Sequence, residues 1–257
     1  MAETAPPEDQ KEQPLVSHLV ELRDRVLRAV GVILVVFVLL MNWSNDIYTF
    51  VAEPLIASLP EGLTMISTGV MDPFFAPFKL TFMVAFFISI PFVLHQAWAF
   101  ISPGLYRNEI RVTFPILVSS VILFYVGLAF CYYVVLGFLF QFFIESAPDI
   151  IKVTPDIKSY LDFVLKLFFA FGVIFEIPVA TVLLVMSGVT TPQDLGAKRA
   201  YVVIGCFVVG MFLTPPDPFS QSMLAIPMWM LFEVGILASR LVYKPDPDED
   251  SGTRESE

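Results

Sequence analysis

Six apolar runs dominate this chain, and the last two are too short for ordinary membrane spans. The fifth covers Ala200 to Leu213 and the sixth covers Met223 to Ala238, with Thr214-Pro215-Pro216-Asp217-Pro218 between them. At about 1.5 Å of rise per residue, helices of these lengths reach roughly 21 and 24 Å, against about 30 Å of hydrocarbon. The last hairpin must therefore thin the bilayer, tilt little, or be sheltered by neighbouring helices.

Composition places the whole chain among membrane proteins. The hydrophobic share is 56%, phenylalanine numbers 26 and the mean hydropathy is +0.75, which is outside the soluble globular range. We expect one all-α integral membrane domain over residues 15–241. The net charge of -10 is concentrated in the tails, residues 1–14 and 242–257, where ten acidic and three basic side chains predict disorder. No basic patch suggests a nucleic-acid partner.

The apolar runs predict six transmembrane helices, at about 26–44, 79–101, 112–144, 161–187, 199–214 and 219–239. With the N-terminus inside, eleven lysines and arginines fall on the inner side and four on or near the outer side. Positive charge favours the cytoplasmic side, so both termini are predicted to be cytoplasmic. The apolar, proline-containing outer loop 45–78 predicts short helices at the interface.

The segment before the first span predicts an amphipathic helix, because Leu15, Leu19, Leu22 and Val26 recur at helical spacing. A second stripe holds charged and polar groups, and these are His18, Glu21, Arg25 and Arg28. Glu21 and Arg25 stand four residues apart, which equally fits a solvated surface ion pair.

Two further acids stand where membrane orientation does not require them. Glu109 lies in the predicted cytoplasmic turn between Arg107 and Arg111. It either pairs with one of these arginines or presents a carboxylate to a cationic ligand. Glu176 lies near the centre of the fourth span, where an acid costs roughly 2.5–3.5 kcal/mol on insertion, so it should face protein or water. Pro178 predicts a kink beside it.

The last hairpin carries polar groups near its outer end. Thr214 and Gln221 can hydrogen-bond across helices, which predicts a docking site for another transmembrane helix. Asp217 fits an ordinary turn residue, and Glu233 fits a group that reaches toward Arg240. Cys131 and Cys206 fit buried thiols, and no catalytic motif or metal-ligand spacing is present, so we expect neither an enzyme nor a cofactor.

Several segments resemble the TatC family, the multispanning receptor subunit of the twin-arginine protein translocase, from about Pro14 to Leu241. The segments are His18-Leu19-Val20-Glu21-Leu22-Arg23, Asp72-Pro73-Phe74-Phe75, Ala97-Trp98-Ala99-Phe100-Ile101-Ser102-Pro103-Gly104-Leu105, Arg107-Asn108-Glu109, Phe171-Gly172-Val173-Ile174-Phe175-Glu176-Ile177-Pro178 and Thr214-Pro215-Pro216-Asp217. The likeness is to proteobacterial members.

The resemblance implies a concave, cup-like helical bundle in the bacterial inner membrane. It implies a receptor that binds twin-arginine signal peptides of folded cargo, recruits the single-span subunits TatB and TatA, forms homo-oligomers within a TatBC complex and uses the proton-motive force. The implied signal-peptide site holds Glu21, Glu109, Arg23 and Phe100, and Glu176 is the implied polar groove residue. Met211, Thr214 and Gln221 are the implied partner-helix contacts, and Pro54 and Asp217 are implied outer-side functional residues.

Two other functions remain open on the residues alone. An ion-coupled secondary transporter would use Glu176 as its proton or substrate site, although we find no second midplane polar group in a corresponding repeat. A passive scaffold would need neither Glu21 nor Glu109 for peptide binding.

Overall fold

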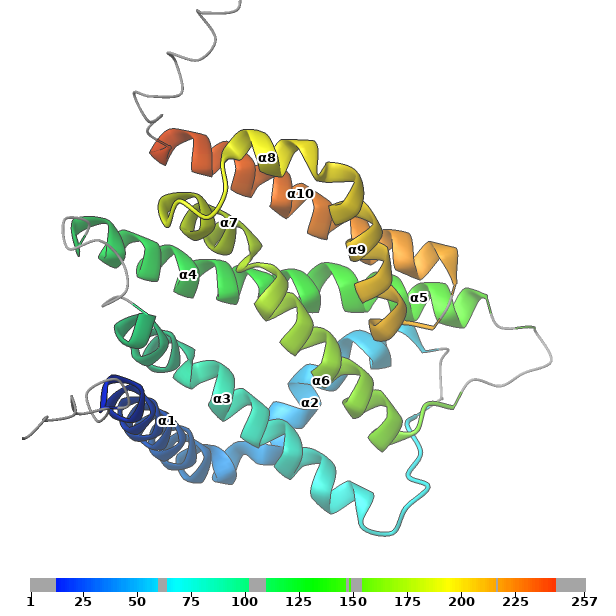
Figure 1. The fold of residues 1–257 in the computed structure, drawn as a ribbon. Coiled ribbons are helices and arrows are strands. Elements are labelled where there is room, and N and C mark those ends of the chain that lie inside the picture. Colours follow the sequence, from blue (N-terminus) through cyan, green and yellow to red (C-terminus); the bar gives the residue numbers. More distant parts are fainter. Residues whose placement is uncertain are drawn as a thin grey trace, which may run out of the picture. The chain divides into compact units, whose positions relative to one another are not determined.

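The computed structural model describes residues 13–59, 64–101, 110–146, 148, 154–215 and 217–243. Within these residues every regular element is a helix, and a single isolated β-bridge joins Ile66 to Asp156 (Figure 1). The helices are α1 (Gln13–Leu40), the 3-10 helix η2 (Met41–Trp43), α2 (Ser44–Ser58), α3 (Asp72–Ile101), α4 (Ile110–Phe130), the π-helix η4 (Cys131–Leu136), α5 (Gly137–Glu145), α6 (Ile157–Ile174), α7 (Ile177–Met186), α8 (Pro192–Ala197), α9 (Arg199–Leu213) and α10 (Pro218–Val242).

The predicted all-helical membrane fold is confirmed. Among the described residues, five helical stretches are long and apolar enough to cross a bilayer, and these are His18–Ala57, Asp72–Phe100, Phe114–Glu145, Ile157–Met186 and Pro218–Val242. The predicted fifth span is the shorter helix α9, which has 15 residues. The number of crossings and the sidedness of the termini stay predictions, as does disorder in the tails, which lie outside the described residues.

The first stretch differs in extent from the predicted span 26–44. The amphipathic approach is helical from Gln13, and the chain continues through η2 into α2 without leaving helical structure. Helix α2 occupies the start of the loop for which short helices are predicted. The backbone remains helical there because no glycine or proline stands between Leu40 and Ser44, and Pro54 is the one proline inside α2.

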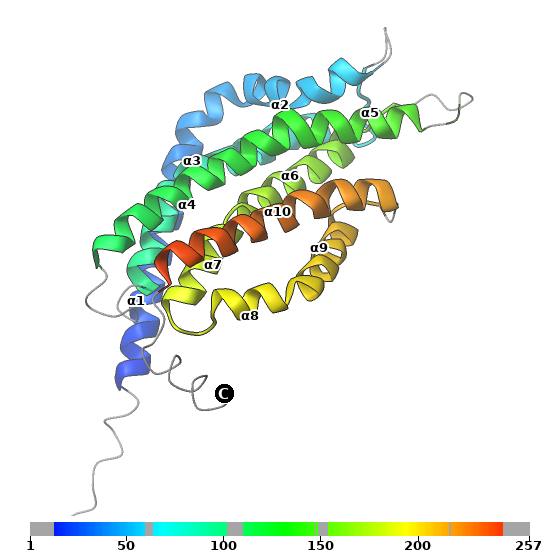
Figure 2. The same cartoon turned by 90° about the horizontal axis from the view of Figure 1, so that it is seen from above.

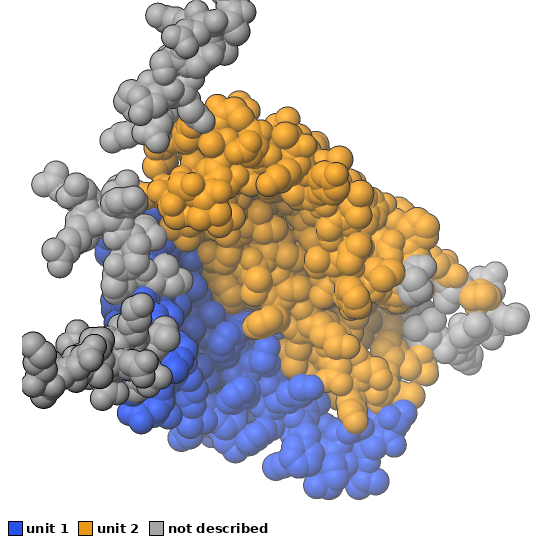
Figure 3. All heavy atoms as spheres, in the orientation of Figure 1, with its two compact units in different colours: residues 1–52, 67–121 blue, residues 53–66, 122–257 orange. Residues whose placement is uncertain are grey.

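The chain divides into two compact units, coloured in Figure 3, and each is described by itself. Unit 1 comprises residues 1–52 and 67–121. Its centre is a pair of antiparallel helices, α1 and α3, which lie side by side in Figure 1. At one end of the pair, Phe37 of α1 contacts Phe78 and Phe82 of α3 edge-to-face, with ring centroids 4.9 and 5.6 Å apart. This geometry is favourable for aromatic quadrupoles and fixes the register of the two helices.

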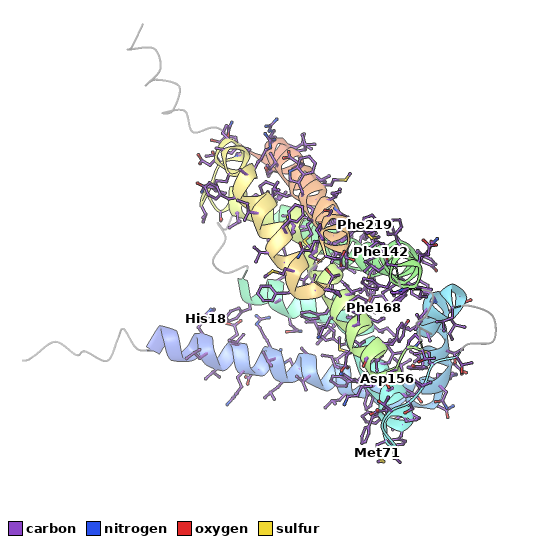
Figure 4. The ribbon with its side chains drawn as sticks, turned by 90° about the vertical axis from the view of Figure 1, so that its right-hand side faces the viewer. His18, Met71, Phe142, Asp156, Phe168 and Phe219 are labelled. Atoms are coloured by element: carbon purple, nitrogen blue, oxygen red, sulfur yellow. The ribbon has the colours of Figure 1, made fainter. Side chains whose placement is uncertain are left out.

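Unit 2 comprises residues 53–66 and 122–257. Helix α10 packs against both α7 and α9, and Figure 2 shows α8 leading into α9 and α9 meeting α10 at the turn before Pro218. A second aromatic cluster joins α5 to α10, because Phe219 stacks on Phe138 and Phe142 with centroids 5.7 and 4.3 Å apart. The close approach of Phe142 and Phe219 is visible in Figure 4.

The predicted kink near Pro178 is present as a full interruption of the helix. Helix α6 ends at Ile174 and α7 begins at Ile177, so Phe175 and Glu176 form the turn between them. Pro178 stands in the first turn of α7, where its missing N–H leaves no helical hydrogen bond unmade. The break therefore places Glu176 at the N-cap position of α7.

Candidate functional site

The inner-end candidates lie where the start of α1 meets the end of α3 in unit 1. The imidazole of His18 stacks on the ring of Phe100, with centroids 4.1 Å apart and planes 17° apart. Figure 4 shows His18 near the start of α1. Because Glu21 follows His18 by three residues, both side chains lie on the same face of α1. The structure thus brings the face of α1 that carries His18 and Glu21 to Phe100.

The carboxylate of Glu21 already holds a guanidinium group. Its Oε1 accepts hydrogen bonds from Arg25 Nε at 3.0 Å and from Arg25 Nη2 at 2.5 Å. The side chain of Glu21 is 41% exposed and that of Arg25 is 21% exposed. The ion pair that the spacing allows is therefore formed, and it shows that this carboxylate is placed to accept a guanidinium fork.

Arg23 is not brought together with Glu21. Two residues apart on a helix means about 200° of rotation, so the two side chains leave opposite faces of α1. Arg23 instead donates from Nε and Nη2 to Asp24 Oδ1, at 3.0 and 2.8 Å, and remains well exposed. Glu109 lies outside the described residues, so its predicted place beside Glu21 stays a prediction.

Glu176 lies at the break between α6 and α7, where the backbone departs from regular α-helix. Its N–H donates to the carbonyl of Val173 at 3.0 Å, and its own carbonyl accepts from Ala180 N–H at 2.8 Å. The residue is half-buried, and its Oε1 atom is buried. The acid is therefore shielded within unit 2, in agreement with the insertion cost that keeps such a group away from lipid.

The three partner-helix candidates lie where α9 and α10 converge. Thr214 is 5% exposed, and its Oγ1 donates to the Gly210 carbonyl at 3.1 Å. Gly210 lies close to Gln221, since a Cβ built on it would stand 3.5 Å from the Gln221 carbonyl oxygen. Met211 is 49% exposed. The structure thus brings Thr214 and Gln221 to one crossing and leaves Met211 on the surface.

The expected contact between Glu233 and Arg240 is wrong. Glu233 instead pairs with Arg199, whose Nε and Nη2 donate to the two carboxylate oxygens at 2.6 and 2.8 Å. Arg240 follows Glu233 by seven residues, about 10 Å along the helix, whereas Arg199 opens the adjacent helix α9. This fork-to-fork pair ties the first turn of α9 to α10.

The two outer-side candidates both belong to unit 2. Asp217 is the N-cap of α10, and its Oδ1 accepts from Ser220 N–H at 2.7 Å. Pro54 lies inside α2. An apolar pocket of about 280 Å³ brings their neighbourhoods together, because Leu55 and Pro215 both line it. The other lining residues are Phe140, Phe143, Ile144, Pro155, Asp156, Ser159, Tyr160 and Phe163.

Two contacts in the inner-end site were not anticipated. The sequence placed His18 on the charged stripe of α1 but did not pair it with Phe100, because that contact depends on the register of α1 against α3. Asp24, the partner of Arg23, was not singled out, although an acid beside two arginines was the available signal. Among the described residues no three His, Cys, Asp or Glu side chains gather as a metal site, and Cys131 and Cys206 are buried free thiols.

A family model described as Sec-independent protein translocase protein (TatC) matches residues 17–227, which is most of the chain. The chain belongs to the TatC family. The Sec-independent protein translocase protein TatC of Azotobacter chroococcum mcd 1 is 52% identical over 250 residues, which cover 97% of this chain and 98% of that protein. The TatC protein of Escherichia coli strain K12 is 55% identical over 228 residues, covering 89% of this chain and 88% of that protein.

Solved structures of the TatC family have the same fold. A crystal structure of the twin arginine translocase receptor TatC superposes with a TM-score of 0.76 at 34% identity, covering 87% of this chain and 98% of that one. A second, in DDM, gives 0.78 at 33% identity over 86% and 99%. This TatC family member is thus a multi-pass membrane component of Sec-independent protein translocation, a transport role.

Proposed function

We propose that this chain is the receptor of the twin-arginine translocase and captures signal peptides at its cytoplasmic face. Glu21, together with Glu109, binds the two arginines, and Phe100 lies at the same site, whereas Arg23 contributes from the opposite face of α1. The observation that carries the proposal is the Glu21 carboxylate, which accepts two hydrogen bonds from a guanidinium beside the His18–Phe100 stack. A pair of arginines in a peptide presents this same chemistry twice.

Selectivity for arginine follows from the shape of the cation. Guanidinium is planar, always charged and presents its donors as a fixed fork, whereas the ammonium group of lysine is a compact point charge. A carboxylate that is placed for a fork gains two aligned bonds from arginine and fewer from lysine. Because Glu21 is 41% exposed, water screens each contact, so the apolar segment of the signal peptide supplies much of the affinity.

The rest of the chain then serves the same receptor. Glu176, shielded at the break between α6 and α7, supplies a polar contact for the membrane-inserted part of the peptide. The single-span partners TatB and TatA dock where α9 and α10 cross. This contact surface includes Thr214, Gln221 and the exposed Met211. The receptor lies in the bacterial inner membrane with both termini cytoplasmic, and it works as a homo-oligomer within a TatBC complex.

The first prediction concerns peptide binding by the purified full-length protein in nanodiscs. Glu21→Ala and Glu109→Ala should each weaken binding of a fluorescent peptide with Arg-Arg by about threefold to tenfold, because each removes a charge-assisted acceptor. The parent protein should bind the Arg-Arg peptide more tightly than its Lys-Lys counterpart. Fluorescence anisotropy measures both affinities.

Asp46→Ala is the matched control, because Asp46 is an exposed acid in the first turn of α2, within the same continuous helical stretch but far from Glu21. It should leave the affinity unchanged. Unchanged binding in both glutamate variants would favour a passive scaffold. Equal affinity for the two peptides, with small-solute transport in liposomes, would favour the carrier that uses Glu176.

A further inference from the structure

Three arginines follow one another along the inner part of α1, and they differ in what they touch. Arg25 donates both of its hydrogen bonds to Glu21, whereas Arg23 donates to Asp24. Arg28 is exposed and makes no ion pair within the part of the chain that the structure describes. Arg25 is also the more buried member of its pair, at 21% exposure against 41% for Glu21. The carboxylate proposed to bind the signal peptide is therefore occupied by an arginine of its own chain.

We infer that the Arg25–Glu21 ion pair is an autoinhibitory contact: Arg25 competes with the signal peptide for Glu21 and lowers the affinity of every peptide that must displace it. This inference rests on the proposed function, because it requires Glu21 to be a contact of the peptide. It adds a residue that acts through the acid rather than by touching the ligand.

The competition follows from which oxygen Arg25 occupies. Both of its hydrogen bonds end on Oε1 of Glu21, and Oε2 accepts none from the residues that the structure describes. A peptide guanidinium that is to bind both oxygens must displace Arg25 from Oε1. Breaking the Arg25 bonds costs the same free energy whichever peptide takes their place. The affinities for arginine and lysine peptides therefore fall by the same factor, and the ratio between them is set by the bonds that each peptide itself makes to Glu21.

The strength of the contact is suited to such a role. An i,i+4 pair at this exposure shifts an equilibrium by no more than about fivefold, so a peptide held also by its apolar segment can displace it. The same four-residue spacing keeps the Arg25 guanidinium beside the carboxylate at all times, so the competitor cannot be diluted away.

The test compares Arg25→Gln with Arg28→Gln in the full-length protein. Both changes remove one positive charge from the same helix, but only Arg25 contacts Glu21. Arg25→Gln should tighten binding of the Arg-Arg and Lys-Lys peptides alike, by about twofold to fivefold, so the ratio of the two affinities stays the same. Arg28→Gln should change both affinities much less. Arg25→Lys should lie between the parent and Arg25→Gln, because it keeps the charge without the fork.

The double variant Glu21→Ala with Arg25→Gln tests whether Arg25 affects peptide binding only through its contact with Glu21. If Arg25 acts only by occupying Glu21, the double variant should bind both peptides as Glu21→Ala alone does. Unchanged or weaker binding in Arg25→Gln, or an equal gain of affinity in Arg28→Gln, would overturn the inference while leaving the receptor proposal intact. Full affinity in Glu21→Ala would instead overturn Glu21 as a peptide contact, and the inference with it. Thermal unfolding of each variant confirms that it is folded.

Discussion

Asp217 stabilises the start of α10, and this structural role can be tested separately from any role in transport. Its carboxylate caps α10 by accepting the Ser220 N–H, one of the donors that a helix start leaves without an intrahelical partner. Asparagine also serves well at an N-cap, whereas alanine cannot accept the bond. The cap and the charge at this position can therefore be removed independently.

At this residue we predict that Asp217→Ala lowers the free energy of unfolding by about 1 kcal/mol, whereas Asp217→Asn costs much less. Urea unfolding in detergent micelles measures both. If the proposed outer-side role depends on charge, Asp217→Asn should reduce export of a twin-arginine reporter while remaining stable. Equal stability of the alanine variant and the parent would contradict the cap.

Residues also show which contacts local spacing can reveal. The Glu21–Arg25 pair was predictable, because four residues along a helix place two side chains together whatever surrounds them. The pairing of Glu233 with Arg199 was not, because the two residues lie on different helices and their meeting depends on how α9 packs against α10.

Helices α7 and α10 make a close contact that depends on a glycine. A Cβ on Gly235 of α10 would stand 2.9 Å from the Thr181 Cβ and 3.0 Å from the Pro178 Cα, both belonging to α7. These distances are too short for carbon atoms in contact, and Pro178 Cα is backbone that cannot rotate away. Gly205 of α9 has nothing within 4 Å of the same position.

We therefore predict opposite effects of one added methyl group in two helices. Gly235→Ala should destabilise the protein by about 1–3 kcal/mol, because the helices must move apart. Gly205→Ala should be neutral or stabilise by up to about 1 kcal/mol through helix propensity. Thermal unfolding in micelles distinguishes the two, and an unchanged midpoint for Gly235→Ala would show that α7 and α10 can separate without cost.

The helices were predictable to different degrees. Pro178 predicted a disturbance of the helix near the break between α6 and α7, because the proline ring and the missing N–H disturb the preceding turn. The π-helix η4 was not predicted, because Cys131 to Leu136 is apolar throughout and carries no glycine or proline. Nothing in that composition distinguishes one helical hydrogen-bond register from another.

For the whole molecule, the short helix α9 decides the topology. Its 15 residues rise about 22 Å, less than the usual hydrocarbon thickness of about 30 Å. If α9 crosses the bilayer, the chain makes six crossings and both termini face the same side. If it does not, the five longer stretches leave the termini on opposite sides.

We predict six crossings. In a protein with Cys131→Ala and Cys206→Ala, single cysteines at Ala2→Cys and Ser251→Cys should react with a membrane-impermeant maleimide only after cells are opened. Ser67→Cys, in the predicted outer loop, should react in intact spheroplasts and serves as the control. Labelling of Ser251→Cys from outside, with Ala2→Cys protected, would establish five crossings.

The sequence by itself determined that this chain is helical and lies in a membrane, where most of the helices run, where one breaks, and that Glu21 faces Arg25. Each of these follows from composition or from spacing within one segment. Only the tertiary structure decided that His18 stacks on Phe100, that Glu233 holds Arg199 and that Ile66 pairs with Asp156. Those contacts depend on the register between elements distant in the chain, and that register is set by how whole helix surfaces pack together.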